Sequence, residues 1–330
     1  MIRNQWYVVL DSKQVREKPV GVTRLGEKLV FWRDSKHKVR CAFDCCPHRG
    51  VALSIGKVHD GHLQCPFHGF EFDSSGQCVY IPADGRSSQP PAAMRLNSYP
   101  TYEAHGFIWI WWGENPPADL EPPPFFDNID ESFYYGSAID PWKAHYSRVI
   151  ENQLDVAHLP FVHYNTIGSG NRTLVDGPKV TWCDKNETMM CTYVFNREDD
   201  GTKPRSADEL EPHDGQVHLE FIMPNLWQNH ISEQVRVLAA LVPVDEENSL
   251  LYLRFYQKFL PVPVIGKWVA QLSMLLNLYI AHQDRVVVET HAVQPSSLRG
   301  GGEKPIKADA PIIEYRRQRE ALKEKERENG

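Results

Sequence analysis

The sequence is short of the features that mark several large protein classes. Only seven cysteines occur in 330 residues, which excludes a disulfide-stapled secreted module and is typical of a reducing compartment. Lysine and arginine number 36 against 43 aspartates and glutamates, so the chain lacks the basic surplus that nucleic-acid binding needs. The N-terminus lacks a basic segment followed by an apolar run. We therefore predict a cytoplasmic protein without a signal peptide.

Long uninterrupted apolar runs are also missing. The nearest approach is the segment 261–281, which Lys267, Gln271 and Asn277 interrupt. Two prolines open this segment and a charged run follows it, so it predicts a buried or half-buried helix rather than a membrane span. We expect no membrane span and no nucleic-acid partner.

A proline-rich stretch at 116–124 divides the chain. Proline continues neither a helix nor a central strand, so this stretch predicts a linker. Residues 1–115 carry short runs rich in Val, Phe, Tyr and Trp between turn-forming pairs, which predicts a small all-β domain. Residues 125–300 carry a block of strand-like segments with helical segments outside it, which predicts an α+β domain. Residues 301–330 form a charged tail for which we expect a solvated helix.

Four strands and two helices are expected in the second domain from its hydrophobic patterns. The expected helices are 146–158 and 264–290, and the expected strands are 188–196, 216–222, 232–244 and 250–258.

Two Cys–His pairs lie in the predicted all-β domain, Cys46 with His48 and Cys65 with His68, with sixteen residues between the pairs. Thiolates and imidazoles bind zinc and iron–sulfur clusters. Three interpretations compete: a chance cluster, a structural zinc site, and a [2Fe–2S] cluster in which two cysteines hold one iron and two histidines the other. Each pair combines one thiolate with one imidazole, whereas zinc modules usually pair like ligands, so we favour the cluster. The remaining cysteines are predicted to be core or bystander thiols without partners: Cys41, Cys45, Cys78, Cys183 and Cys191.

A second group, Asn152, Asp155, His158 and His163, lies in the predicted α+β domain. On a helix Asp155 and His158 share a face, whereas His158 and His163 lie about 140° apart. Pro160 between the histidines predicts a bend that brings them together. Two histidines and one carboxylate form the facial triad of non-heme Fe(II) sites, so a metal site is favoured over a surface helix.

The spacing does not identify which acidic residue supplies the carboxylate ligand of this site. Four acidic residues are candidates by type and position: Glu151, Asp155, Asp284 and Glu289.

The stretch 46–82 resembles the Rieske domain of the non-heme iron oxygenases, and the resemblance extends from Trp6 to about Glu289. It implies an N-terminal all-β Rieske domain and a C-terminal catalytic domain with an antiparallel sheet and covering helices, of the helix-grip type. The implied ligands of the [2Fe–2S] cluster are Cys46, His48, Cys65 and His68. The implied ligands of the mononuclear Fe(II) are His158, His163 and Asp284.

The resemblance also implies roles for further residues. Asp155 matches the carboxylate that bridges His158 to the Rieske histidine, here His68, of a neighbouring subunit in a head-to-tail homotrimer. Asn152 matches a position near the iron. Asn225 and Trp227 precede or begin strands that line the substrate pocket in this family, although loop packing explains both residues equally well.

A Rieske cluster beside a facial-triad iron implies reductive activation of O₂. The sequence has no G-x-G-x-x-G after a strand, so electrons are expected from a separate NAD(P)H-dependent reductase, directly or through a ferredoxin. The chain length resembles the compact class that includes the dicamba and vanillate O-demethylase oxygenase components. This predicts hydroxylation or O/N-demethylation of a small aromatic or largely apolar molecule. The alternatives are a ring-dihydroxylating dioxygenase and a non-catalytic Rieske electron-transfer protein.

Overall fold

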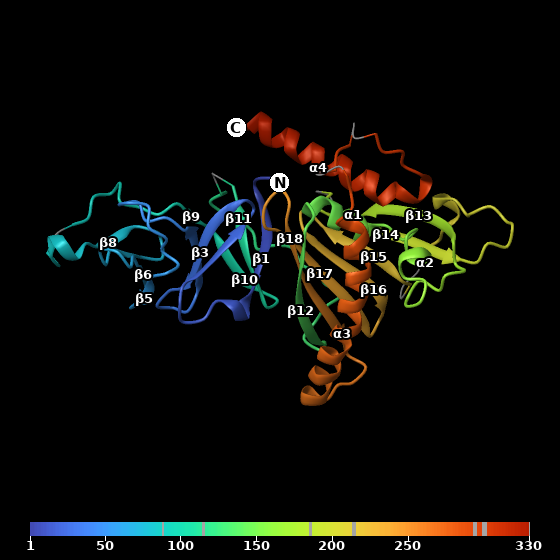
Figure 1. Cartoon of the computed structure of the whole chain (residues 1–330), viewed down its shortest axis with the longest axis horizontal. Coiled ribbons are helices and arrows are strands. Elements are labelled where there is room, and N and C mark those ends of the chain that lie inside the picture. Colours follow the sequence, from blue (N-terminus) through green and yellow to red (C-terminus); the bar gives the residue numbers. More distant parts are fainter. Residues whose placement is uncertain are drawn as a thin grey trace. The chain divides into compact units, whose positions relative to one another are not determined.

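The structure is a computed structural model of the chain and describes residues 1–87, 89–113, 116–184, 187–212, 216–292, 296–298 and 302–329. The chain forms two compact units that divide between Pro123 and Pro124, inside the predicted linker. Figure 1 shows unit 1 in blue to cyan and unit 2 in green to red.

Unit 1 is built from three small antiparallel sheets, in agreement with the predicted all-β domain. The first sheet has the order β1 (Gln5–Asp11), β11 (Phe107–Trp112) and β10 (Thr101–Ala104). The second has the order β2 (Val20–Arg24), β3 (Glu27–Arg33), β4 (Val39–Phe43) and β9 (Ser98–Tyr99). The third has the order β5 (Lys57–His59), β6 (His62–Gln64), β7 (Glu71–Phe72) and β8 (Cys78–Tyr80). Short 3₁₀ turns follow β1 and β8, at Ser12–Gln14 and Pro82–Asp84.

The core of unit 1 consists of two clusters of buried side chains. One contains Tyr7 and Phe31, and the other contains Trp32, Cys46 and Cys65. Because both cysteines belong to the same cluster, the loops that carry them are anchored to one packed interior.

Unit 2 is one seven-stranded antiparallel sheet with helices on one of its faces (Figure 1). Its strand order is β12 (Tyr134–Trp142), β18 (Ser249–Gln257), β17 (Val235–Pro243), β16 (Leu226–Ser232), β15 (His218–Ile222), β14 (Met189–Arg197) and β13 (Leu174–Trp182). Its helices are α1 (Tyr146–Leu154), α2 (Leu159–Val162), α3 (Pro263–Val288) and α4 (Ala310–Asn329), with 3₁₀ turns at Ala207–Glu209 and Lys307–Asp309.

The sequence patterns missed three of the seven strands, β12, β13 and β16. The strand β12 contains Gly136 and Pro141, which are depleted in strands. The strand β16 carries a glutamine, an asparagine and a histidine between its apolar residues, so its alternation is weak. Of the three, only β12 pairs with a strand that is distant in the chain, β18, whereas β13 and β16 pair with strands that adjoin them in the sequence.

The prediction of one helix over 146–158 is wrong. The helix α1 ends at Leu154, because Asp155 takes an extended conformation (φ −83°, ψ 136°), and a new short helix starts after His158. The Asp155 carboxylate accepts a hydrogen bond from the Ala157 amide (2.6 Å), which stabilises the break. Pro160 lies in the first turn of α2, where proline is tolerated, so the break precedes the proline.

The expectation of a solvated C-terminal helix is also wrong. The helix α4 buries Tyr315, Gln318 and Arg319. The Tyr315 ring packs edge-on against Phe221 of β15, with ring centroids 5.6 Å apart. A high density of charged residues therefore concealed one buried face.

Two of the cysteines predicted to lack partners form a disulfide, Cys183 with Cys191. The bond closes the hairpin that connects β13 with β14. The free cysteines among the described residues are Cys41, Cys45, Cys46, Cys65 and Cys78.

The helix α3 is long and apolar enough to cross a membrane by length and composition alone. One strip of the helix is buried, at Gly266, Ala270, Met274, Ala281, Asp284 and Val288. The opposite strip exposes large apolar residues such as Trp268 and Leu272. The prediction of a half-buried helix agrees with this arrangement, and the prediction that the segment does not span a membrane stays a prediction.

Candidate metal centres and active site

The two Cys–His loops of unit 1 have the same backbone structure. The amide of Gly50 donates to the carbonyl of Cys46 (2.9 Å), and the amide of Gly69 donates to the carbonyl of Cys65 (3.0 Å). Both glycines have positive φ, +74° and +76°, a conformation that glycine adopts without strain. Two matching turns therefore present one thiol and one imidazole each.

The donors of the two loops are arranged to fit a [2Fe–2S] cluster. Cys46 and Cys65 are buried, whereas His48 and His68 are exposed, and the two imidazole rings lie 4.8 Å apart. Burial raises the pKa of the Cys46 thiol to about 11, so thiolate formation there needs the positive charge of bound metal. This separation of inner thiols and outer imidazoles matches a cluster with one Cys₂ iron and one His₂ iron.

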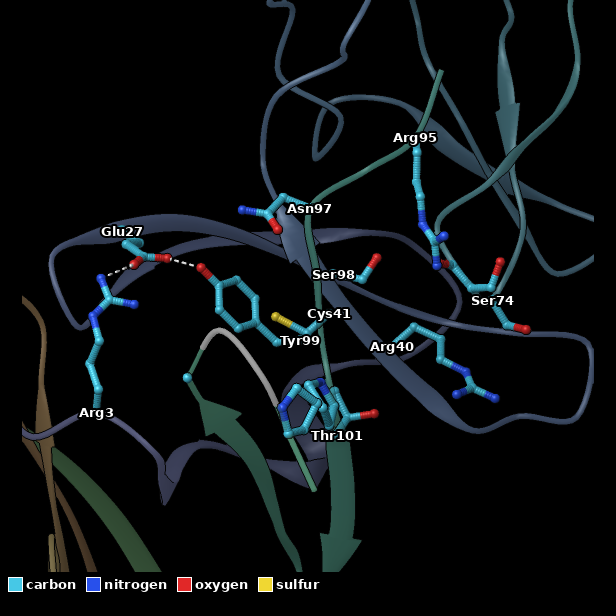
Figure 2. Close-up of a pocket in the computed structure, with 14 residues that line it drawn as sticks. Arg3, Glu27, Arg40, Cys41, Ser74, Arg95, Asn97, Ser98, Tyr99 and Thr101 are labelled. Carbon is cyan, nitrogen blue, oxygen red and sulfur yellow. Dashed lines mark hydrogen bonds and ion pairs between the residues drawn. The ribbon is translucent and has the colours of Figure 1, made fainter. Parts of the chain in front are cut away.

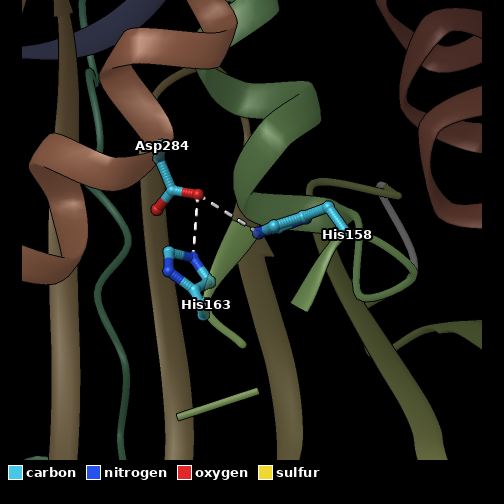
Figure 3. A group of neighbouring side chains, drawn as sticks. All are labelled: His158, His163 and Asp284. Atoms are coloured by element: carbon cyan, nitrogen blue, oxygen red, sulfur yellow. Dashed lines mark ion pairs between the residues drawn. The ribbon is translucent and has the colours of Figure 1, made fainter. Parts of the chain in front are cut away.

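The second candidate centre lies in unit 2, where three helices meet. Nε2 of His158 is 3.2 Å from Oδ1 of Asp284, and Nε2 of His163 is 2.9 Å from the same oxygen. Figure 3 shows both rings turned toward this carboxylate. His158 and His163 flank α2, and Asp284 lies in the buried strip of α3. The structure thus brings together two histidines and Asp284, one of the four candidate carboxylates.

Neighbouring side chains fix the orientation of these donors. Nδ1 of His163 donates to Oε1 of Gln283 (2.9 Å), which leaves Nε2 as its lone-pair nitrogen. Nδ2 of Asn152 donates to Oδ1 of Asp284 (3.2 Å). The bond from His163 to Gln283 is typical of metal-binding histidines, which usually donate their other ring N–H to an acceptor. Gln283 was missed in the sequence, because an amide next to a candidate ligand carries no distinctive spacing.

Asp155 lies on the other side of His158. Its Oδ2 is 3.4 Å from Nδ1 of that histidine, so the carboxylate faces the ring nitrogen that is turned away from Asp284. Burial opposes protonation of His158, but Asp155 and Asp284 outweigh it and raise the pKa of His158 to about 9. Two carboxylates beside one half-buried imidazole make a site that favours a bound cation.

The three donors fit a mononuclear metal. One ligand atom from each of His158, His163 and Asp284 can be placed so that all three lie within 4.8 Å of one another. Two imidazoles and one carboxylate are the donor set of a facial triad, which leaves other coordination positions open. These residues would therefore hold iron and leave room for O₂.

A partly buried network of ion pairs supports the helix that carries Asn152. Glu151 of α1 accepts hydrogen bonds from Arg316 of α4 (2.7 and 2.9 Å) and from Arg148 (2.9 Å). Glu303 pairs with both arginines, at 2.7 Å from Arg316. The helix α4 therefore holds α1 in place one residue before Asn152.

A cavity of about 170 Å³ adjoins the His–His–Asp group. Its lining is mostly apolar and includes Trp227, Leu219, Val237, Leu251, Leu253, Ile280 and Ile231, with the amides of Gln153, Asn229 and Asn277. The predicted lining residue Trp227 is present. The other predicted lining residue, Asn225, is fully buried at the turn before β16 and lies outside the lining of this cavity. Asn229 and Asn277 carry no motif and were missed.

Comparison with known proteins decides the family. The model of the Rieske [2Fe-2S] domain matches residues 5–100, and that of the vanillate O-demethylase oxygenase C-terminal domain matches residues 142–325. The chain belongs to the Rieske oxygenases of the vanillate O-demethylase type. Both Cys–His pairs of this Rieske oxygenase lie within the first match, and His158, His163 and Asp284 lie within the second.

Two curated relatives and one solved structure illustrate the similarity. Dicamba O-demethylase, oxygenase component, from Stenotrophomonas maltophilia is 37% identical over 165 residues, which cover 49% of this chain and 48% of that protein. Chlorophyllide a oxygenase from Chlamydomonas reinhardtii is 36% identical over 334 residues, which cover 97% of this chain and 48% of that protein. The chain thus spans about half the length of these curated relatives. The structure of dicamba monooxygenase bound to dicamba has a TM-score of 0.75 at 24% identity, covers 99% of both chains, and shows the same fold.

A further hollow of about 610 Å³ lies in unit 1 of this Rieske oxygenase (Figure 2). Three of its charged side chains, Arg3, Glu27 and Arg40, form ion pairs with neighbours. Arg3 lies 4.0 Å from Glu27, which also accepts a hydrogen bond from the Tyr99 hydroxyl. Arg40 lies 2.7 Å from Asp34. We therefore place the chemistry at the cavity of unit 2, which adjoins the candidate metal ligands.

Proposed function

We propose that this chain is the terminal oxygenase component of a multicomponent system that uses O₂ and external electrons to hydroxylate or O/N-demethylate a small molecule. The observation that carries the proposal is the meeting of His158, His163 and Asp284 beside a largely apolar cavity. A chain with this group and a Rieske domain has both halves of an electron-fed oxygenase. A non-catalytic electron-transfer protein would use only the first half.

The proposed ligands divide between the two units. A [2Fe–2S] cluster would be held by Cys46, His48, Cys65 and His68. Fe(II) would be held by His158, His163 and Asp284 and would supply O₂ activation when bound.

The other side chains at the iron site position these ligands. Gln283 holds His163 with Nε2 toward the site. Asn152 holds Asp284 through its amide, and Asp155 faces the far nitrogen of His158. The mostly apolar lining suits a substrate with a largely apolar surface.

The substrate class follows from the cavity. A largely apolar space of about 170 Å³ accommodates one aromatic ring, since an engineered cavity of about 150 Å³ binds benzene. The printed names of relatives include a dicamba O-demethylase and a chlorophyllide a oxygenase. The cavity size favours a single-ring substrate over a chlorin macrocycle.

Partners are proposed on chemical grounds. Electrons come from an NAD(P)H-dependent reductase, directly or through a ferredoxin. The active assembly is a homotrimer in the cytoplasm, in which Asp155 connects His158 to His68 of a neighbouring subunit. Two observations support this role of Asp155: its side chain is one-quarter exposed, and His68 is exposed, so both are accessible.

We also propose that the chain does not span a membrane. Packing of α3 on β12 and β18 supports this proposal.

The test is a substrate screen with the holoenzyme and an added reductase. Single-ring methoxy and N-methyl aromatics are offered under ¹⁸O₂, and O₂ uptake and products are followed by mass spectrometry. We expect O₂ uptake coupled to loss of a methyl group or gain of one oxygen atom. A cis-diol with two ¹⁸O atoms would favour the dihydroxylating alternative. A reducible cluster without any substrate-dependent O₂ uptake would favour the electron-transfer alternative.

A further inference from the structure

A second group of two histidines and one carboxylate lies in unit 2. It consists of His218 and Glu220 of β15 and His230 of β16, with one potential ligand atom from each within 4.8 Å of the others. In the sheet, His218 lies directly opposite His230. No sequence motif marks these residues, because they come together only through strand pairing.

This group lies on the face of the sheet opposite the iron-site cavity. Leu219, Trp227 and Asn229 line the cavity. Side chains alternate between the two faces of a strand, so His218 and His230, each next to one of these residues, point to the other face. The two groups are therefore separate sites.

His218 is arranged as a metal ligand. Its Nδ1 lies 2.7 Å from the carbonyl oxygen of Gln216 and donates to it. The remaining nitrogen, Nε2, lies 3.1 Å from Oε1 of Glu220. With Nδ1 protonated, a neutral ring turns a lone pair toward the carboxylate. Two facing lone pairs need a cation or a proton between them.

Glu220 is held in place from its other side. The amide of Asn128 donates to both carboxylate oxygens (3.1 Å each), and the amide of Gln228 also donates to the carboxylate. Glu220 is buried, so these donors fix its orientation toward His218. Supporting hydrogen bonds of this kind are typical of carboxylates that bind metals.

His230 is buried without a hydrogen bond from a described residue to either ring nitrogen. Only 6% of the residue is exposed, yet neither ring nitrogen has a hydrogen-bond partner among the residues that the structure describes. Its ring lies 4.4 Å from that of His218. An unsatisfied buried imidazole is costly, and a metal ion would satisfy one of its nitrogens.

The surrounding charges permit a divalent cation. Arg236 lies opposite His230 on β17 and opposes a positive ion. Glu233 lies 3.6 Å from Nε2 of His230 and is mostly exposed, so its carboxylate can turn toward an ion. Glu220 and Glu233 together outweigh the single guanidinium.

We propose that His218, Glu220 and His230 form a structural site for a divalent first-row transition metal of the zinc type. Two imidazoles and a carboxylate suit zinc, with Glu233 or water in the fourth position. The ion would join β15 to β16 behind Leu219 and Asn229, and would thereby stiffen one wall of the cavity. This site is independent of the iron site and of the proposed reaction.

The test measures zinc in the holoenzyme. Protein with its cluster and iron is incubated with Zn²⁺, passed over a chelating resin, and assayed for zinc and iron by mass spectrometry. The variants are His230→Gln and Glu220→Gln. The control is His145→Gln, another buried histidine, which contacts Ser147 and lies outside both groups. Asp284→Asn reports zinc that occupies the iron site instead.

We expect about one zinc per chain in wild type, His145→Gln and Asp284→Asn, and close to none in His230→Gln and Glu220→Gln. Zn²⁺ should also raise the melting temperature of wild type but not of His230→Gln. Cluster absorption and circular dichroism check that each variant is folded. The proposal is overturned if wild type retains no zinc, or if both ligand variants retain as much zinc as His145→Gln.

Discussion

The two candidate iron centres are built in different ways. The donors of the cluster lie between residues 46 and 68, on two turns with the same hydrogen bonds. The donors of the mononuclear site lie at the two ends of α2 and in α3, and Asp284 is far from His163 in the chain. The first centre therefore depends on local backbone structure, and the second depends on the packing of unit 2. Substitutions that perturb the packing of unit 2 should therefore affect the mononuclear site and leave the cluster intact.

The largest expected effect is that of Asp284→Asn. Both histidines direct Nε2 toward Oδ1 of this carboxylate, so its charge is central to metal binding. We expect loss of the mononuclear iron and of product formation, with an unchanged cluster EPR signal. The control Cys46→Ser should show the reverse, with the cluster lost and the mononuclear iron retained. Loss of the cluster in Asp284→Asn would contradict the independence of the two centres.

Asp155→Asn should separate metal binding from electron delivery. The carboxylate faces His158 without being one of the three ligands, so both iron centres should remain loaded. In the proposed trimer the substitution should abolish turnover coupled to the cluster. Rapid-freeze EPR of the reduced enzyme would follow cluster oxidation after O₂ and substrate are added. Oxidation at the wild-type rate, with normal product, would rule out the bridging role.

Gln283→Leu should have a smaller effect on the same site. Loss of the acceptor for Nδ1 of His163 frees the orientation of the ring. Removal of such supporting groups costs about 10–100-fold in metal affinity or activity. Iron titration monitored by activity would measure the change. The conservative variant Gln283→Glu, which keeps an acceptor oxygen, should recover most of the affinity, and failure of both variants alike would argue against a positioning role.

Arg316→Met should weaken unit 2 while it leaves the cluster loops intact. Arg316 joins α4 to Glu151 of α1, and Arg148 still pairs with Glu151 after the change. We expect a loss of about 1–3 kcal/mol in the free energy of unfolding of unit 2, measured by denaturant titration. Iron should be released before the cluster absorption is lost.

The same network gives the smallest expected effect, a dependence on acid pH. Burial would raise the pKa of Glu303, but its pairing with Arg148 and Arg316 outweighs burial and lowers it. A carboxyl group with a lower pKa in the folded state stabilises the protein above its unfolded pKa, and this contribution is lost as the pH falls through the folded pKa. As the pH falls through the acid range, the melting temperature of wild type should therefore decline more steeply than that of Glu303→Gln. Equal slopes would indicate that the ion pairs do not contribute.

The sequence predicted the parts of both centres that depend on local structure. The pairs Cys46–His48 and Cys65–His68, and the two histidines around Pro160, are recognisable by spacing alone. The carboxylate ligand could not be recognised by spacing, because Asp284 meets His163 only after α3 packs on the sheet. The same reason explains the missed residues Gln283 and Asn229, and the buried face of α4. Residues that act through tertiary contacts leave no periodic pattern in the sequence.

The measurement that tests the account most directly is the iron and acid-labile sulfide content of purified, active protein, compared with that of Asp284→Asn. The account predicts about three irons and two sulfides per chain in wild type, and about two irons and two sulfides in the variant. Full product formation by wild-type protein that holds only two irons per chain would contradict it.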